Sequence, residues 1–255
     1  MLCATLFRPA VGEPIPVRHV EGTEHGFLVL RTQEGRRIAF GDLVQVVRGD
    51  RVISRLTFRF RDGSLDDETT VFSQRHNFQL ISDHHVQKGP SFPHSIDTSL
   101  DFGRGQVTVH SMDKDGKEKV TSDHMDLPPD LSNGMLLSLV KNIRPDSPET
   151  KVSMVVATPK PRLVKLAISP RGEDRFSIAG SPRKAMHYDI KIQLGGVAGV
   201  VAPIIGKAPS DIHIWILEGK APCFVKEEGA LYEGGPIWSI QLASPVWPPG
   251  SGDGF

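Results

Sequence analysis

Strict alternation of apolar and polar residues recurs along this chain of 255 residues. The alternation has no exception over residues 55–61, and residues 186–194 repeat it. Shorter runs with one apolar face are centred on residues 164–168 and 212–216. Because successive side chains of a strand point to opposite faces of a sheet, each run predicts a strand with one face in a core. The pattern therefore indicates a protein made mainly of β-sheet.

Turn residues separate the expected strands at regular intervals. Gly35, Gly49 and Gly63 are fourteen residues apart, and each lies in or beside a short polar turn. Glycine supplies the positive φ that tight hairpin turns need. Residues 17–126 are therefore expected to form an antiparallel meander, and further strands are expected near 212–217, 222–227 and 237–243.

A single amphipathic helix is expected after residue 130. Four apolar residues at helical spacing share one stripe, namely Leu136, Leu139, Val140 and Ile143. Ser132 or Asn133 is expected to cap its start. A lone helix must bury its stripe against another element, so we expect it on the concave face of a large curved sheet, a half-barrel or barrel. Residues 17–247 are read as one β-rich domain, with tails at 1–16 and 248–255.

Composition excludes several classes of protein. Thirty basic residues balance thirty acidic ones, which argues against a nucleic-acid partner. No uncharged run reaches the ~20 residues that a transmembrane helix needs, and no signal peptide is recognised near Met1. The two cysteines, Cys3 and Cys223, allow one disulfide or none, and oligomeric state is left open. The P-loop, G-x-G-x-x-G, H-E-x-x-H and G-x-S-x-G motifs do not occur in the sequence, and no cofactor is expected.

The first functional hypothesis is a non-enzymatic module that binds an apolar or lipid-like ligand. A curved sheet wider than its helix would enclose an apolar cavity. His76 shares the parity of Phe72 and Phe78, and we expect it at the edge of the core. The residues expected to line the cavity are Phe58, Phe60, Phe72, His76, Phe78, Leu136, Leu139, Tyr188, Ile190 and Trp215.

Two alternatives remain open at this point. The first is a metal-assisted hydrolase, because Asp83 with His84 and Asp123 with His124 offer carboxylate and imidazole ligands. The second is a structural or partner-binding module that uses an exposed sheet edge near residues 222–226.

A row of arginines accompanies one expected strand. Arg55, Arg59 and Arg61 share one parity, so their side chains line one face. A solvated outer face is favoured there over a site that grips an anion.

The C-terminal third carries a resemblance to known proteins. A strand around Trp215 is followed by a Gly turn, by Pro-x-Phe-Val at 222–225 and by Gly-x-Leu-Tyr-x-Gly-Gly-Pro-Ile-Trp at 229–238. Together with residues 127–134, this arrangement resembles uncharacterised bacterial exported proteins of the DUF3108-like group. The layout is also similar to the half-barrels of periplasmic lipoprotein carriers, whose concave face holds acyl chains. The resemblance implies a periplasmic or otherwise exported protein.

Overall fold

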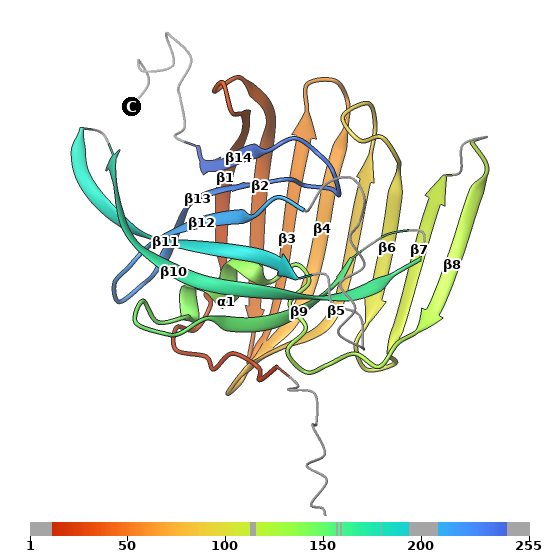
Figure 1. The fold of residues 1–255 in the computed structure, drawn as a ribbon, viewed down its shortest axis with the longest axis horizontal. Coiled ribbons are helices and arrows are strands. Elements are labelled where there is room, and N and C mark those ends of the chain that lie inside the picture. Colours follow the sequence, from red (N-terminus) through yellow and green to blue (C-terminus); the bar gives the residue numbers. More distant parts are fainter. Residues whose placement is uncertain are drawn as a thin grey trace, which may run out of the picture.

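The computed structural model describes residues 12–112, 116–156, 158, 160–178, 180–193 and 209–243. These residues form fourteen strands and one short helix (Figure 1). The elements in chain order are β1 (Glu24–Thr32), β2 (Arg37–Arg48), β3 (Arg51–Phe60), β4 (Leu65–Gln74), β5 (Phe78–Lys88), β6 (Ile96–Asp101), β7 (Gln106–Met112), β8 (Glu118–His124), α1 (Leu136–Asn142), β9 (Thr150–Val156), β10 (Arg162–Ile178), β11 (Ser181–Gln193), β12 (Ile212–Leu217), β13 (Cys223–Gly229) and β14 (Trp238–Leu242).

All fourteen strands belong to one antiparallel sheet. Their order is β8-β7-β6-β5-β4-β3-β2-β1-β14-β13-β12-β11-β10-β9, so each strand lies beside its neighbour in sequence except where β1 pairs with β14. The sheet stays open because β8 and β9, at the two ends of this order, do not pair. The predicted fold class, a curved antiparallel sheet with one helix, is confirmed.

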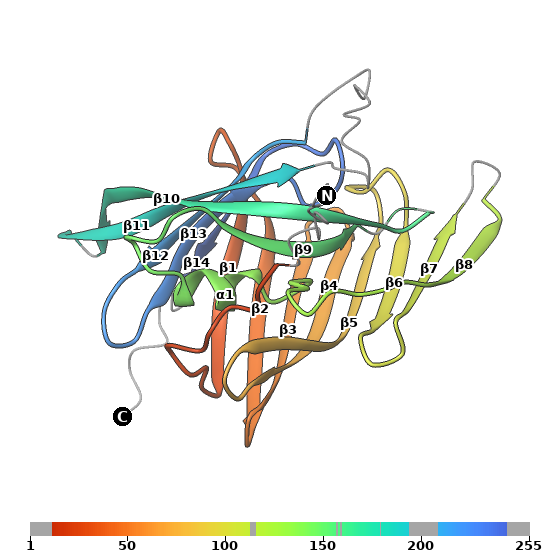
Figure 2. The same cartoon turned by 60° about the horizontal axis from the view of Figure 1, so that its bottom comes forward.

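The sheet bends so that its two arms face each other. The N-terminal arm (β1–β8) and the C-terminal arm (β9–β14) cross, with α1 between them (Figure 2). One apolar cluster joins the arms and includes Phe72 and Leu80 from β4 and β5, Tyr188 and Ile190 from β11, and Leu139 from α1. These side chains are almost completely buried, and their burial offsets the entropy lost when the arms are ordered.

The helix begins differently from the sequence prediction. Met135 occupies the N-cap position, and no side chain caps the helix. Ser132 instead donates its hydroxyl to the carbonyl oxygen of Ser153, and the Asn133 amide donates to that of Val155. The capping expectation was wrong because these two polar side chains satisfy the backbone of β9. Gly134 follows with φ +63°, a conformation that favours glycine.

Polar contacts fix α1 to both arms. Lys141 Nζ lies 2.7 Å from Glu21 Oε2 in the segment before β1. At the other side, Tyr188 donates its hydroxyl to the carbonyl oxygen of Ile143 at 2.9 Å. The segment before β1 also contributes to the core, since Ile15 is 95% buried in the apolar cluster that joins the two arms, called the joint cluster below. Ile15 and Pro16, which forms a β-bridge with Asn77, therefore contact the domain. The domain boundaries expected from the sequence stay a prediction.

Two further predictions concern the C-terminal part of the chain, namely a sheet edge and a tail. β13 lies between β12 and β14. Within residues 222–226, however, β14 pairs only with Lys226, and Cys223 and Phe224 pair with β12 alone. The predicted exposed edge at residues 222–226 therefore stays a prediction. The expected C-terminal tail, 248–255, lies outside the described residues.

Replacing Leu139 with Ala tests whether α1 supports the core. Leu139 is 98% buried, so we expect Leu139→Ala to lower the free energy of unfolding by about 2–5 kcal/mol. Leu136 lies on the same helix but is partly exposed, and Leu136→Ala should cost roughly 1 kcal/mol. Urea unfolding of both variants measures the difference. Equal losses would show that α1 does not pack as described.

Candidate functional site

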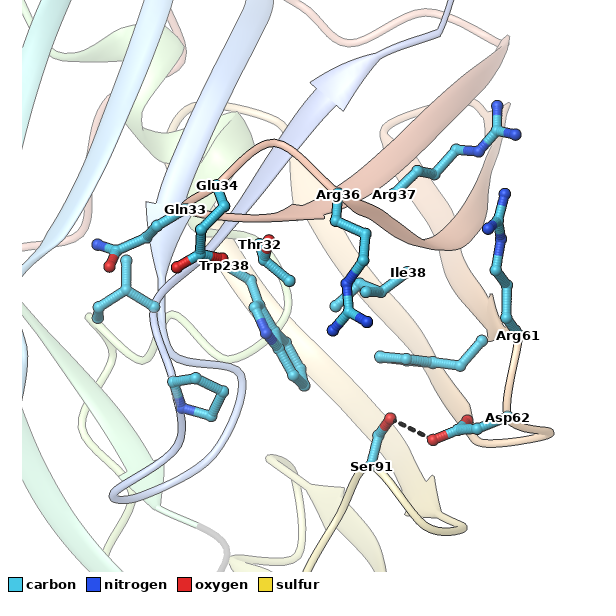
Figure 3. A pocket seen from close by; sticks show the side chains of 13 residues that line it. Thr32, Gln33, Glu34, Arg36, Arg37, Ile38, Arg61, Asp62, Ser91 and Trp238 are labelled. Carbon is cyan, nitrogen blue, oxygen red and sulfur yellow. Dashed lines mark hydrogen bonds between the residues drawn. The ribbon is translucent and has the colours of Figure 1, made fainter.

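A hollow of about 650 Å³ opens at one end of the sheet, where several turns meet. The β1–β2 turn, the β3–β4 turn, the β5–β6 loop and the segment before β14 form its walls (Figure 3). Pockets of several hundred Å³ hold most small-molecule ligands. The size of this hollow therefore suits a small organic molecule or part of a lipid.

Aromatic side chains form the base of the hollow. Phe60 and Trp238 line it, with ring centroids 5.5 Å apart, and Phe92 lies 5.4 Å from Phe60 behind them. Tyr232 completes the group at 5.7 Å from Phe92. These rings belong to the second apolar cluster, between β1, β2, β3 and β14. They give the hollow a rigid apolar base.

Charged residues stand at the mouth of the hollow. Arg36 extends into it above Ile38, whereas Arg37 points away and stacks on Phe40, 4.4 Å from its ring centroid (Figure 3). Arg61 follows directly after β3 and also lines the opening. Among the described residues, no side-chain partner is found for the Arg61 guanidinium. In Figure 3 the Arg61 side chain runs along the rim toward Arg37, so its guanidinium lies at the outer edge of the mouth and not over Trp238.

The acidic side of the mouth is tied into a turn. Ser91 donates its hydroxyl to Asp62 Oδ2 at 2.7 Å, and the Ser64 backbone N–H donates to Asp62 Oδ1 at 2.9 Å. The hydrogen bond from Ser91 is the main reason that the pKa of Asp62 lies below its ordinary value. This carboxylate therefore holds the β3–β4 turn against the β5–β6 loop.

A cluster of polar side chains, called the inner group below, lies deeper, on the inner face of β4 and β5. His85 Nε2 is 2.7 Å from Asp66 Oδ1, and the Gln87 amide donates to Asp66 Oδ2 at 3.1 Å. Beside them, Thr70 donates its hydroxyl to Asp83 Oδ1 at 2.8 Å. The Gln87 amide also donates to the carbonyl oxygen of Leu231, which links the N-terminal arm to the β13–β14 loop.

Burial perturbs the acid–base properties of this inner group. Burial raises the pKa of Glu68, and the nearby Asp83 raises it further. Burial alone would lower the pKa of His85, but the carboxylates of Glu68, Asp66 and Asp83 raise it to about 10. His85 is therefore a cation at neutral pH and pairs with Asp66.

Glu227 faces the same interior from β13. Its cross-strand neighbours are the apolar Ile214 and Ile240, and burial raises its pKa to about 7. Glu227 also contributes to the raised pKa of Glu68, which shows that the two arms approach each other here. The interior thus contains carboxyl groups that hold protons near neutral pH.

The structure distributes the predicted lining residues among several places. Phe60 lines the hollow at the end of the sheet. Leu136 packs on the joint cluster while partly exposed. The others placed in the two apolar clusters are Phe58, Phe72, Phe78, Leu139, Tyr188 and Ile190, all at most 2% exposed. The role of these residues in ligand binding stays a prediction.

Two predicted lining residues lie elsewhere. Trp215 is on the outer face of β12, opposite Ile214 and Ile216, because side chains alternate along the strand. His76 is exposed in the turn between β4 and β5, since β4 ends at Gln74. Placing either of them in the interior was wrong.

The predicted metal ligands do not come together. Asp83 faces the interior, whereas the adjacent His84 faces outward and pairs with Asp97 at 2.9 Å. Asp123 and His124 belong to β8, three strands from β5 in the sheet order, which is a distance of ~14 Å. These four residues therefore cannot share one ion, and that prediction was wrong.

Sequence reasoning weighed an anion site for Arg61 and favoured a solvated face, and it missed Arg36 and the buried carboxyl groups of Glu68 and Glu227. The arginines of the mouth come from separate turns, and only the sheet order brings Arg36 beside Arg61. In residues 66–70 polar side chains fill both parities, so no alternation indicates which of them face inward. The usable signal was the shared parity of Asp66, Glu68 and Phe72.

We expect the raised pKa of Glu227 to make stability depend on pH. The pKa of this carboxyl group rises from 4.5 to about 7 on folding, so the folded state holds the proton more tightly than the unfolded state. This difference stabilises the fold fully below pH 4.5, and the stabilisation is lost as the pH rises from 4.5 to about 7. Glu227→Gln should remove this loss, so the variant should gain about 1–3 kcal/mol over the native protein between these limits. Urea unfolding across this pH range measures the gain.

Glu228→Gln provides the matched control. Glu228 is the next residue, lies on the opposite face and pairs with Lys226. Its variant should follow the native pH dependence. A Glu227→Gln curve parallel to the native curve would contradict a raised pKa at this position.

Comparison with known proteins gives only distant likenesses. No family model matches the chain, and no curated protein matches it. A β-barrel-like protein of the domain of unknown function DUF1849 from Brucella abortus is similar over 90% of this chain and all of its own, with 12% identity and a TM-score of 0.45. The hypothetical lipoprotein YmcC from Escherichia coli K12 is similar over 88% of this chain and 86% of its own, with 10% identity and a TM-score of 0.38. The chain is thus similar to uncharacterised bacterial proteins, and the DUF3108-like resemblance is not confirmed.

Proposed function

We propose that this protein is a non-enzymatic binding module for an amphipathic, anionic, lipid-like molecule. The observation that carries the proposal is the hollow at the end of the sheet, which combines an aromatic base with arginines at its mouth. An apolar tail would lie against Phe60 and Trp238, and an anionic head would meet Arg36 and Arg61. Burying an apolar tail contributes ~25 cal/mol per Å².

The location of the hollow differs from the cavity that the sequence suggested. α1 and the apolar side chains of both arms occupy the space between the arms. Carboxyl groups such as Glu68 and Glu227 face the remaining inner surface, which is unfavourable for an acyl chain. These features support a ligand held at the end of the sheet.

The enzymatic alternative loses its basis in this geometry. It depended on a metal ion shared by Asp83, His84, Asp123 and His124, and these side chains lie on different faces and strands. The proposal therefore rests on binding alone.

Location in the periplasm, or otherwise outside the cytoplasm, is part of the proposal. It rests on the sequence layout that resembles exported bacterial proteins and lipoprotein carriers. Among the described residues, no helix has the length and apolarity to cross a membrane. Fractionation of the native cells should recover the protein with periplasmic markers, and recovery only with cytoplasmic markers would contradict this part.

Calorimetric titration with decanoate and decanol tests the ligand class. The two molecules share an aliphatic chain, and only decanoate carries a negative charge. We expect one molecule of decanoate to bind per chain, and more tightly than decanol. Arg36→Gln and Arg61→Gln should each raise the Kd for decanoate roughly fivefold, the effect of losing about 1 kcal/mol.

Arg59→Gln serves as the control for charge. Arg59 lies two residues before Arg61 but faces solvent near Asp42 on the outer face. This variant should bind decanoate like the native protein. Absence of decanoate binding, or equal weakening in all three variants, would overturn the proposed ligand class.

A further inference from the structure

Three potential metal ligands converge on the outer face of the sheet. His187 and Asp189 lie two residues apart on β11, and His213 lies on the neighbouring β12. In the antiparallel register His213 is directly opposite Asp189. Alternation along the strands places all three on the face opposite Tyr188 and Ile214, which are buried in the core. A rigid part of the sheet therefore positions the group.

The three ligand atoms form a small triangle. His213 Nδ1 is 2.8 Å from Asp189 Oδ1, and His187 Nε2 is 3.1 Å from His213 Nδ1 and 3.3 Å from Asp189 Oδ1. Zinc binds nitrogen and oxygen ligands at ~2.0–2.2 Å, which places neighbouring ligand atoms roughly 3 Å apart. The triangle thus has the dimensions of one face of a metal coordination sphere.

The hydrogen bonds within this group compete at one nitrogen, His213 Nδ1. A ring nitrogen carries either one hydrogen or one lone pair. His213 Nδ1 therefore cannot donate to Asp189 Oδ1 and accept from His187 Nε2 at the same time, although both atoms are within 3.1 Å. A cation at the centre would meet a lone pair from each of the three atoms.

Surrounding side chains hold the three ligands in place. Arg171 Nε donates to Asp189 Oδ2, which leaves Oδ1 directed at the group. Asp174 Oδ2 lies 3.4 Å from His187 Nδ1 and accepts the indole N–H of Trp215 at 2.8 Å. The Trp215 ring stacks on the His187 ring, with centroids 4.4 Å apart and an interplanar angle of 14°. Such outer contacts fix the tautomer and orientation of metal-bound imidazoles and carboxylates.

We infer that His187, Asp189 and His213 form a binding site for a divalent transition-metal ion, with zinc as the best match. Two imidazoles and one carboxylate suit zinc, and three protein ligands leave a coordination position for water or another ligand. The His213 side chain is 34% exposed, so an ion reaches the site from solvent. Arg171 partly neutralises Asp189, so we expect a Kd on the order of micromolar. This site is separate from the hollow and does not depend on the proposed ligand.

Calorimetric titration of the full chain with zinc chloride at neutral pH tests the inference. The native protein should bind one zinc ion per chain at this site. His213→Gln and His187→Gln should each raise the Kd at least tenfold. His213→Gln changes the most exposed of the three side chains, and its melting temperature without metal shows whether the fold is retained.

His84→Gln is the matched control. His84 is an exposed histidine on the outer face and pairs with a single carboxylate, Asp97. Its variant should bind zinc with the native Kd. Zinc should also raise the melting temperature of the native protein and of the His84→Gln variant, but not that of His213→Gln. No binding by the native protein at about 100 μM zinc, or equal binding by all variants, would overturn the inference.

Discussion

The contact of α1 with both arms of the sheet determines where this protein can hold another molecule. A sheet of fourteen strands cannot stay flat, because each strand is twisted relative to its neighbour. Here the twist brings the two arms face to face, and the helix fills the space between them. Leu139 supplies the apolar contact, while Lys141 and the carbonyl of Ile143 supply polar contacts to opposite sides. The middle of the molecule is therefore core, and accessible space remains at the end of the sheet.

The fold was largely predictable because alternation is a local signal. The perfect run at 55–61 became most of β3, and the run at 186–194 lies in β11. The same signal also placed Trp215 opposite Ile214 and Ile216, so its position outside the core was readable from sequence. His76 was misplaced because the strand around it breaks into a turn, and its neighbours carry no glycine or proline to indicate one.

The candidate sites were much less predictable, because each joins segments that are far apart in sequence. The pairing of Asp189 with His213 depends on the register of β11 against β12, which is regular. The pairs on either side of these strands, β10–β11 and β12–β13, contain bulges at Pro170–Gly172 and Trp215–Ile216. A bulge shifts register by one residue and leaves little trace in composition. The mouth of the hollow depends on four connections meeting at one end of the sheet. Propensity and periodicity predict elements, but the convergence of their ends follows from three-dimensional curvature.

The two proposed sites use different faces of the same sheet. The hollow lies at its end, against the apolar cluster of Phe60 and Trp238, and the histidine group lies on its outer face. The buried carboxyl groups of Glu68 and Glu227 add polarity to the interior. This division lets one rigid sheet present two chemically distinct surfaces without either disturbing the core.

The central claim is that a lipid-like ligand is held at the end of the sheet and not between its arms. Intermolecular nuclear Overhauser effects between decanoate and the protein test this claim most directly. We expect contacts from the ligand methylene groups to the rings of Phe60 and Trp238. Contacts to Tyr188 and Ile190, in the joint core, would contradict it.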